Sequence, residues 1–472
     1  MTTKFFLRRQ KGGGLVYALV IMAVVQVILV SIVQYVASNV QYSLTIRSRE
    51  QAIQIAEAGI DFYRWYLAHN VEGKTASQIQ AFWDGGTAYG VGTAYEADYT
   101  DPSGATTGRY RIEVTSPENG STVAIVKSTG WTYKHPAVQR VVQVRLRRPS
   151  WSESAVLAND FMRFGAGTEV YGKIHSNAGI RFDGIAHNLI TSSVATYNDP
   201  DHTGGNEFGV HTHDTPVDPL PPAAVPARTD VFEAGREFPA TTLDFNGVLG
   251  DLSYMKSEAQ SGQGVYFTGS GANNRGTQIE LRTDGTFRAR QVRTFNNAYS
   301  VTAYNGAWAN YTIPDDGVIF VEDNVWVSGT INDRRVTIVA ADLLGGPAPS
   351  VYILNDIRYT NNDGRDIIGI IAQNNIEIAW ASENDLRIDA ALLAQQGRVG
   401  REHYTSKGYS PDSKTVITIY GAIATNLRYG FAWTDGTGYT TRNLYYDNNL
   451  LYYPPPYFPT GTQYELDLWE EL

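Results

Sequence analysis

The sequence predicts a mainly β protein that begins with one long α-helix, and three observations support this fold class. From Leu15 to about His69 there is no proline and a single glycine, so nothing in this stretch ends a helix. Residues 94–147 alternate between apolar and polar side chains in short runs separated by turn residues. Residues 151–472 repeat a plan of apolar β runs joined by polar elbows. The chain has 472 residues, enough for two or three domains.

Composition excludes several kinds of chemistry. The chain contains no cysteine, which rules out disulfides, thiolate metal sites, iron–sulfur clusters and cysteine nucleophiles. Its net charge is −10 with only 18% charged residues, so the chain as a whole has no electrostatic basis for wrapping nucleic acid, and no nucleic-acid partner is predicted.

The first half of the predicted helix has the properties of a membrane span. Leu15 to Val36 is a stretch without charges, and at about 1.5 Å per residue it spans roughly 33 Å, enough to cross a hydrocarbon core of about 30 Å. Basic residues precede it, which predicts a cytoplasmic N-terminus and an external body: Lys4, Arg8, Arg9 and Lys11. A cleaved signal peptide is not predicted, because it would have a shorter apolar core followed by small residues.

The second half of the helix is amphipathic. In "REQAIQIAEAGIDFYRWYLAHN", apolar residues recur at intervals of three and four: Ile53, Ala56, Ile60, Tyr63 and Leu67. This face is expected to pack on a globular head, whereas the first half projects from it.

The N-terminal pattern resembles that of type IV pilin-like proteins. The pattern consists of a basic residue, glycine, a small residue, an apolar helix and then "AEAGI" at residues 56–60. It is most similar to minor pilins of the PilX type and to K-type pseudopilins of type II secretion. The resemblance implies that a prepilin peptidase cuts between Gly12 and Gly13 and often methylates the new N-terminus. Residues 1–12 would then be the leader, and residues 13–70 the transmembrane and amphipathic helix.

One position departs from the family pattern. Major subunits carry Glu at the fifth mature position, where this chain has Tyr17. A buried Glu neutralises the N-terminal ammonium of a neighbouring subunit, and an unpaired charge in lipid is costly. K-type pseudopilins also lack this Glu, so the resemblance implies a place at a filament tip. The alternative is a single-pass anchor that no peptidase processes.

Residues 71–150 are expected to form a pilin-like β-sheet head. The strand candidates are "AYEADYT", "GRYRIEVTS", "STVAIVKSTGWTY" and "AVQRVVQVRLR". Turn signals lie between them, at Asp101–Pro102, 117–120 and His135–Pro136. Short connections of this kind predict a small antiparallel sheet beside the helix.

Residues 151–472 are expected to form a parallel β-solenoid. Four repeats have elbows near Asn324, Asn355, Asn375 and Gly397, and the later ones recur about every 20 residues. Runs such as "VIFV", "IIGIIA" and "AALLA" are apolar throughout, as in parallel strands buried on both faces. Residues 160–185 have the same texture and would supply the first coils. A β-sandwich head is the alternative.

Two segments depart from the repeat. Residues 196–250 form a Pro- and His-rich insertion. Residues 196–228 have no predicted regular structure, and loops of this length are often functional or disordered; "DVFEAGREF" and "LSYMKSEAQ" are candidates for a short helix beside them. Residues 439–472 are rich in Tyr and Pro. Three consecutive prolines at 454–456 prevent a further coil, so an extended cap over the end of the solenoid is expected.

Candidate chemistry is sparse. His211 and His213 share one face of an extended segment with Asp214 adjacent, and such nitrogen and oxygen ligands could hold a metal; a polar loop with scattered histidines is the alternative. The segments 199–207 and 361–366 have oxygen ligands for Ca²⁺ but lack EF-hand spacing. Acids on the repeats are candidates for acid–base catalysis: Asp356, Asp366, Glu377 and Asp389. No nucleophile elbow, phosphate loop or zinc-protease motif is present, so we predict neither an enzyme nor a required cofactor.

The sequence therefore predicts a minor, tip or initiating subunit of a type IV pilus or a type II secretion-like pseudopilus. Its head would serve filament initiation or adhesion to a surface glycan or protein receptor. The predicted partners are other pilin-like subunits through the helix, the prepilin peptidase and membrane lipid. The chain would lie in the cytoplasmic membrane, head outside, before it reaches the cell surface. The alternative is a membrane-tethered protein that binds or degrades polysaccharide.

Overall fold

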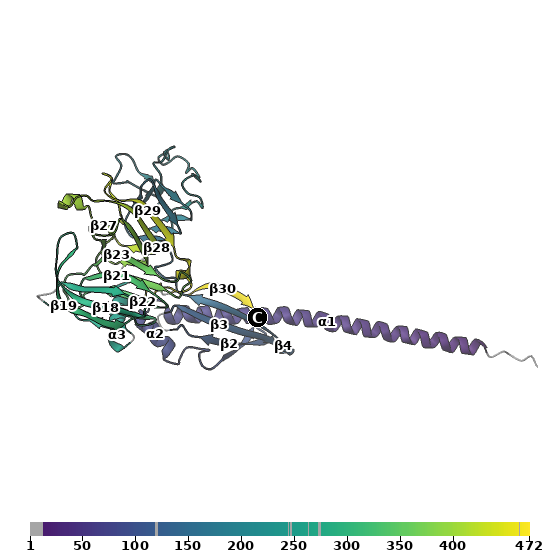
Figure 1. The fold of residues 1–472 in the computed structure, drawn as a ribbon. Helices are drawn as coiled ribbons and strands as arrows, with labels where there is room; N and C mark the ends of the chain where they lie inside the picture. Colours follow the sequence, from purple (N-terminus) through teal and green to yellow (C-terminus); the bar gives the residue numbers. More distant parts are fainter. Residues whose placement is uncertain are drawn as a thin grey trace, which may run out of the picture.

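The computed structural model describes residues 13–118, 121–243, 245, 248–262, 264–271, 275–461 and 463–472. A long N-terminal helix is followed by a mostly β body, which confirms the predicted fold class at that level (Figure 1). The predicted leader, including Gly12, lies outside the described residues.

The helix and a small sheet form the first part of the body. Helix α1 (Gly13–Val71) is continuous, and α2 (Ala76–Asp84) follows it. Thr75 caps α2 in a reciprocal capping box with Gln78, which explains where this helix begins. The sheet strands that come next in sequence are β1 (Tyr95–Thr100), β2 (Thr106–Thr115), β3 (Val123–Thr132) and β4 (His135–Arg147).

A strand from the opposite end of the chain completes this sheet. Strand β30 (Glu465–Glu471) pairs antiparallel with β4, so the order is β1-β2-β3-β4-β30. The chain's C-terminus therefore lies beside α1 (Figure 1). The prediction that residues 439–472 form one extended cap is wrong for this strand, which covers the edge of β4 instead.

Most of the rest of the body is built from parallel strands, which form three ladders. In the first ladder the strands stack in this order: β16 (Gly264–Phe267), β20 (Gly317–Val321), β22 (Arg335–Ala340), β24 (Ile367–Ala372), the end of β26 (Asp385–Ala394), the end of β28 (Ser413–Thr425), β5 (Val156–Ala158), β8 (Ile174–Ser176), β11 (Ile190–Ser192) and β15 (Arg236–Glu237).

The second and third ladders share two long strands. The second contains β17 (Gly276–Leu281), β21 (Val325–Ile331), β23 (Val351–Tyr359), β25 (Ile376–Ile378) and β27 (Val399–Arg401), and a separate three-stranded group contains β6 (Met162–Phe164), β9 (Ile180–Phe182) and β14 (Val210–His211). The third runs from the ends of β21 and β23 through the starts of β26 and β28 to β29 (Gly438–Tyr446), β7 (Thr168–Tyr171) and β10 (Ile185–Ala186).

Register in the first ladder aligns one column of aliphatic side chains. The partners, in stacking order, are Val265, Ile319, Ile338, Ile370, Leu392, Ile423, Val156, Ile174 and Ile190. Residues beside this column, such as Phe320 and Val339, belong to a second buried cluster on the other face. Both faces are buried, which is why these strands read as continuously apolar runs.

The second cluster is covered by a helix and by part of the C-terminal segment. Helix α3 (Val248–Ser261) contributes Leu252 and Met255, and the C-terminal segment contributes Tyr457 and Phe458. At Gly369 an added Cβ would lie 2.7 Å from Pro455 Cβ, so the proline run passes directly over β24. This part of the predicted cap does lie across the stack, but over a side face and not over its end.

The stacking order differs from the chain order. Residues 160–185 were expected to supply the first coils, but the strands formed by residues 156–192 stack beyond β28, at the opposite end from β16. After residues 156–237 the chain passes through α3 to β16 at the opposite end of the stack. The following strands then add in order until β28 pairs with β5. Sequence order could not show this, because a parallel ladder accepts any apolar strand of matching length.

The Pro- and His-rich insertion is more regular than predicted. β12 (Thr196–Tyr197) and β13 (Glu207–Phe208) form a small antiparallel pair, and β14 and β15 pair in parallel with β9 and β11. Part of 196–250 is thus stacked on the head. At the other end, β17 begins an antiparallel meander with β18 (Thr286–Phe295) and β19 (Val301–Thr312). Short 3-10 helices span Tyr404–Lys407 and Asn448–Leu451.

Candidate functional sites

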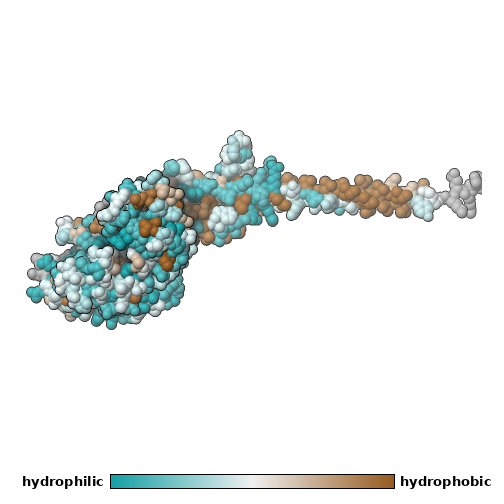
Figure 2. All heavy atoms as spheres, turned by 90° about the horizontal axis from the view of Figure 1, so that it is seen from above, coloured by the Kyte–Doolittle hydropathy of each residue, from teal (hydrophilic) through white to brown (hydrophobic). Residues whose placement is uncertain are grey.

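The two halves of α1 differ in burial. Within the described part of the chain, α1 is the one helix long and apolar enough to cross a membrane, and its apolar half contacts nothing in the fold. The side chains of Leu15 and Tyr17 are 71% and 73% exposed. Figure 2 shows this half as an apolar rod that projects from a mostly hydrophilic body. Gly13 is the first residue of α1, so Tyr17 lies one turn into a free helix.

The second half of α1 is held tightly against the sheet. Ala56, Ile60, Tyr63 and Leu67 of the predicted face are all buried, whereas Ile53 is only partly buried. At Gly130 of β3, an added Cβ would lie 2.3 Å from the carbonyl oxygen of Ala52 and 2.4 Å from the backbone nitrogen of Ala56. The helix backbone therefore rests directly on β3.

Gly59 has a packing role on the same face. An added Cβ there would lie 2.3 Å from Ser128 Oγ and 3.1 Å from the ring of Tyr110. Glycine in a helix costs about 1 kcal/mol relative to alanine, but here it allows α1 to approach the sheet. The glycine of "AEAGI" is thus required by the helix–sheet contact.

Histidines and carboxylates gather at the outer end of the stack. His211 and His213 lie with Asp199 and Glu207, and one ligand atom from each of the four residues lies within 4.8 Å of the others. His213 Nε2 is 2.9 Å from Glu207 Oε1, and His211 Nε2 contacts Glu207 Oε2. Sequence reasoning identified the two histidines as a pair on one face but did not connect the two acids to them.

Asp214, the third predicted ligand, is not part of this cluster. Its side chain is 58% exposed, and its nearest cation is Arg228, with 4.0 Å between Oδ2 and Nη2. Successive side chains of an extended segment point to opposite sides, so Asp214 cannot share the face of His211 and His213. The acids arrive instead through the β12–β13 hairpin, in which Tyr197 pairs with Glu207 and Asp199 follows two residues later. The sequence signal for this hairpin was the turn-rich loop that separates Asp199 from Glu207.

Asp199 is ionised in this environment. Burial by itself would raise its pKa, but His211, the backbone N–H of Asp201 and the Arg181 guanidinium lower the pKa to about 2. The carboxylate is 2% exposed. The cluster therefore contains a buried negative charge beside two imidazoles.

The acids considered for catalysis have structural partners. Arg398 donates to Glu377 across 2.9 Å, and Arg387 donates to Asp389 across 2.7 Å. Burial is the largest influence on the carboxyl of Glu377 and raises its pKa to about 7. Asp366 accepts the backbone N–H groups of Thr360 and Asn361, as in an ordinary turn. These contacts explain the acids as parts of the stack.

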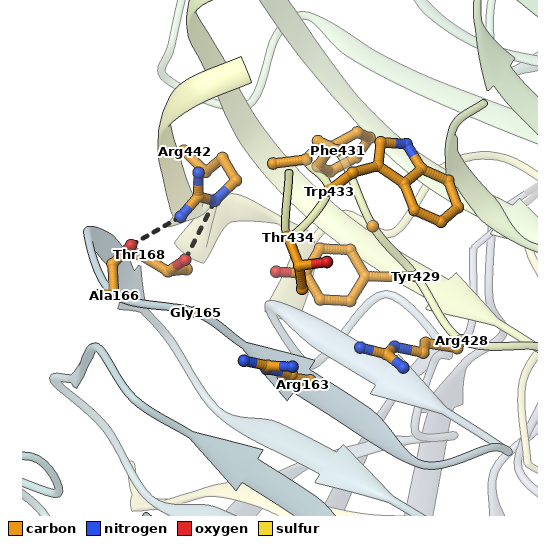
Figure 3. Close-up of a pocket in the computed structure, with 12 residues that line it drawn as sticks. Arg163, Gly165, Ala166, Thr168, Arg428, Tyr429, Phe431, Trp433, Thr434 and Arg442 are labelled. Atoms are coloured by element: carbon orange, nitrogen blue, oxygen red, sulfur yellow. Dashed lines mark hydrogen bonds between the residues drawn. The ribbon is translucent and has the colours of Figure 1, made fainter. Parts of the chain in front are cut away.

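A pocket lies between residues 163–168 and residues 428–442 (Figure 3). Its volume is about 240 Å³, and Arg163, Arg428 and Trp433 line it. Both arginines pair with Asp201, at 3.5 Å for Arg163 and 2.6 Å for Arg428. Arg442, also in its wall, is committed to Thr168 Oγ1 and the carbonyl of Ala166. The pocket combines an aromatic face with more positive than negative charge.

Comparison with known proteins gives little further information. No family model and no curated protein matches the chain. Among solved structures, the competence-associated pilin ComZ from Thermus thermophilus aligns with 90% of this chain and 97% of its own, at 12% identity and a TM-score of 0.27. A similarity of that size carries no argument about fold or function.

Proposed function

We propose that this protein is a minor subunit of a type IV pilus or a type II secretion-like pseudopilus, placed at the tip or at initiation. The observation that carries the proposal is the division of α1. One continuous helix has an exposed apolar half and a second half locked on an antiparallel sheet. Such a helix can wait in the membrane and then pack among other helices in a filament without refolding.

The head supports the tip position. We take it to be a β-solenoid, a reading supported by the parallel ladders and the aligned aliphatic column. If the protein were a shaft subunit, each further copy of this large head would have to fit beside the previous copy. The size of the head therefore favours a single copy at the tip. Tyr17 in place of the shaft subunit's Glu agrees with a position that has no preceding neighbour to neutralise.

Processing is tested by the intact mass of the chain recovered from membranes and from sheared filaments. The proposal expects a chain that begins at Gly13, with or without one methyl group. Gly12→Val should block the cut, whereas Gly14→Ala, beyond the scissile bond, should not. A filament-associated chain that still begins at Met1 would contradict the proposal.

Position is tested by labelling the head. Leu344 is 73% exposed and precedes Gly345, which has a positive φ, so a short epitope fits in this loop. Gold-labelled antibody should mark filament ends only. Label spaced along the shaft would contradict the tip position, and absence of label from filaments would favour a simple membrane tether.

The pocket of Figure 3 favours a second candidate function, the binding of an acidic surface glycan. Trp433 offers a stacking face, and Arg163 and Arg428 offer cations. Under this candidate, Trp433→Ala and Arg163→Ala should abolish retention on acidic polysaccharide. Lys134→Ala, a substitution in the β3–β4 turn, is the matched loss of a positive charge away from the pocket.

A further inference from the structure

The geometry points to a structural zinc site formed by Asp199, Glu207, His211 and His213, and we propose that Zn²⁺ there fastens residues 196–218 to the outer end of the stack. The inference is independent of the filament role, because it concerns how the head holds its last coil. Its basis is the arrangement of the nitrogen and oxygen atoms of these four side chains.

Two buried atoms in the cluster lack hydrogen-bond partners. His211 Nε2 and Asp199 Oδ2 form no hydrogen bond of regular geometry, although these residues are 1% and 2% exposed and His211 Nε2 lies against Glu207 Oε2. A buried polar atom without a partner costs about 1–3 kcal/mol. Both atoms face the same point, 3.6 Å apart, with Glu207 beside them. A bound cation would satisfy both.

The other nitrogen of His211 defines what Nε2 can do. His211 Nδ1 lies 3.3 Å from the carbonyl oxygen of Phe208, and a carbonyl only accepts, so Nδ1 carries the proton. In a neutral ring Nε2 then presents a lone pair. This lone pair faces carboxylate oxygens of Glu207 and Asp199, which also carry lone pairs. A cation bound between these atoms would remove the repulsion between the lone pairs, and a ring nitrogen fixed in this way is typical of a metal-ligating histidine.

The donor set and spacing suit zinc. Two imidazole nitrogens and two carboxylate oxygens fit a four-coordinate structural site. Zinc–ligand bonds of about 2.0–2.2 Å place two tetrahedral ligands about 3.4 Å apart. The separations of 2.9 Å between His213 Nε2 and Glu207 Oε1 and 3.6 Å between His211 Nε2 and Asp199 Oδ2 lie near this value, whereas His211 Nε2 and Glu207 Oε2 are in closer contact and would move apart to admit the metal. Calcium is disfavoured because it takes six to eight oxygens.

The ligands come from separate pieces of backbone. Asp199 follows β12, Glu207 is in β13, and His211 is in β14, which pairs with β9 of the stack. A metal held by all four residues would tie the hairpin to the ladder. In a chain without cysteine no disulfide can do this. His202 closes the side nearer solvent, with Nδ1 3.1 Å from Glu207 Oε1.

The test uses the full chain in detergent, purified without a polyhistidine tag and stripped with chelator. Zn²⁺ alone is added, and metal content after gel filtration is measured. We expect one zinc per chain. Glu207→Gln and His211→Asn, which keep side-chain shape, should lower zinc affinity by more than the roughly 10–100-fold seen on loss of a supporting residue. His187→Ala is the matched control: His187 pairs with Glu233 at 2.8 Å outside the cluster and should retain one equivalent.

Two further readouts keep the test decisive if a variant folds poorly. In the wild-type chain, zinc should slow amide hydrogen exchange within residues 196–218 and leave β22 and β24 unchanged. Co²⁺ in the same site should give the intense visible bands of a tetrahedral centre. Substoichiometric zinc, wild-type affinity in folded Glu207→Gln, or exchange at 196–218 that zinc does not alter would each overturn the proposal.

Discussion

Val156 of β5 and Ile423 of β28 are register partners in adjacent parallel strands, although most of the head lies between them in sequence. Both belong to the aliphatic column of the first ladder and are fully buried. Each half of the head would leave an open strand edge if it were separated from the other, and open edges invite aggregation. The pairing joins the coils built from residues 156–237 to those built from residues 264–446.

We expect Ile423→Ala to loosen both halves of the head. Shortening a buried isoleucine costs about 2–5 kcal/mol, and here the cavity would lie at the junction. Hydrogen exchange should accelerate in β5 as well as in β28. Ile190→Ala is the control, because Ile190 lies near the end of the same column and pairs only with β8 and β15. Acceleration in β28 without any change in β5 would show that the junction is not cooperative.

Gly130→Ala is expected to lift α1 from the sheet. Its Cβ would collide with helix backbone, which cannot move aside as a flexible side chain can. Overpacking of this kind typically costs about 1–3 kcal/mol. The thermal midpoint of the full chain in detergent should fall, with faster exchange in residues 48–71. Gly165→Ala is the matched control, since nothing lies within 4 Å of its added Cβ, and it should leave the midpoint unchanged. Equal midpoints for the two variants would refute the contact argument.

Removal of residues 463–472 should destabilise the sheet from its new edge. Strand β30 contributes ion pairs from Asp467 to Arg145 and from Glu471 to Arg140, and Tyr464 accepts a hydrogen bond from Trp83 Nε1 at 2.9 Å. Exchange of β4 amides should increase and aggregation should rise. A chain extended by a short Gly-Ser tail after Leu472 retains β30 and serves as the control. A truncated chain with unaltered β4 protection would mean that β30 is dispensable.

Glu377 should make stability depend on pH. Burial raises its pKa from an ordinary value of 4.5 to about 7 in the folded state, so the folded chain binds more protons than the unfolded chain between these values. The contribution of Glu377 to the free energy of unfolding is therefore fully present below about pH 4.5 and is lost as the pH rises through 7.

The expected loss is up to about 3 kcal/mol between pH 5 and pH 8. Glu377→Gln cannot ionise and should lack this part of the dependence, while Arg398 keeps Glu402 at 3.7 Å as a partner. Denaturant midpoints of both chains at the two pH values measure the difference. A gap between the chains that does not change with pH would contradict the assignment to Glu377.

Much of the fold could be predicted because its signals are local. The absence of helix breakers predicts α1, and the spacing of Ala56, Ile60, Tyr63 and Leu67 predicts its buried face. The candidate metal cluster was only half predictable. His211 and His213 are two residues apart on one extended segment and therefore share a face, but Asp199 and Glu207 reach them through a hairpin, which no periodicity in the sequence reveals.

The sequence by itself determined the long helix, its apolar and amphipathic halves, and the class of the body, since each follows from the periodicity of neighbouring residues. Tertiary structure alone decided the order in which strands stack, the insertion of β30 beside β4, and the meeting of Asp199 and Glu207 with the histidines. The physical reason is that apolar strands of similar length fit one another in many orders. Which two become neighbours depends on the packing of the whole chain, as the pairing of Val156 with Ile423 shows.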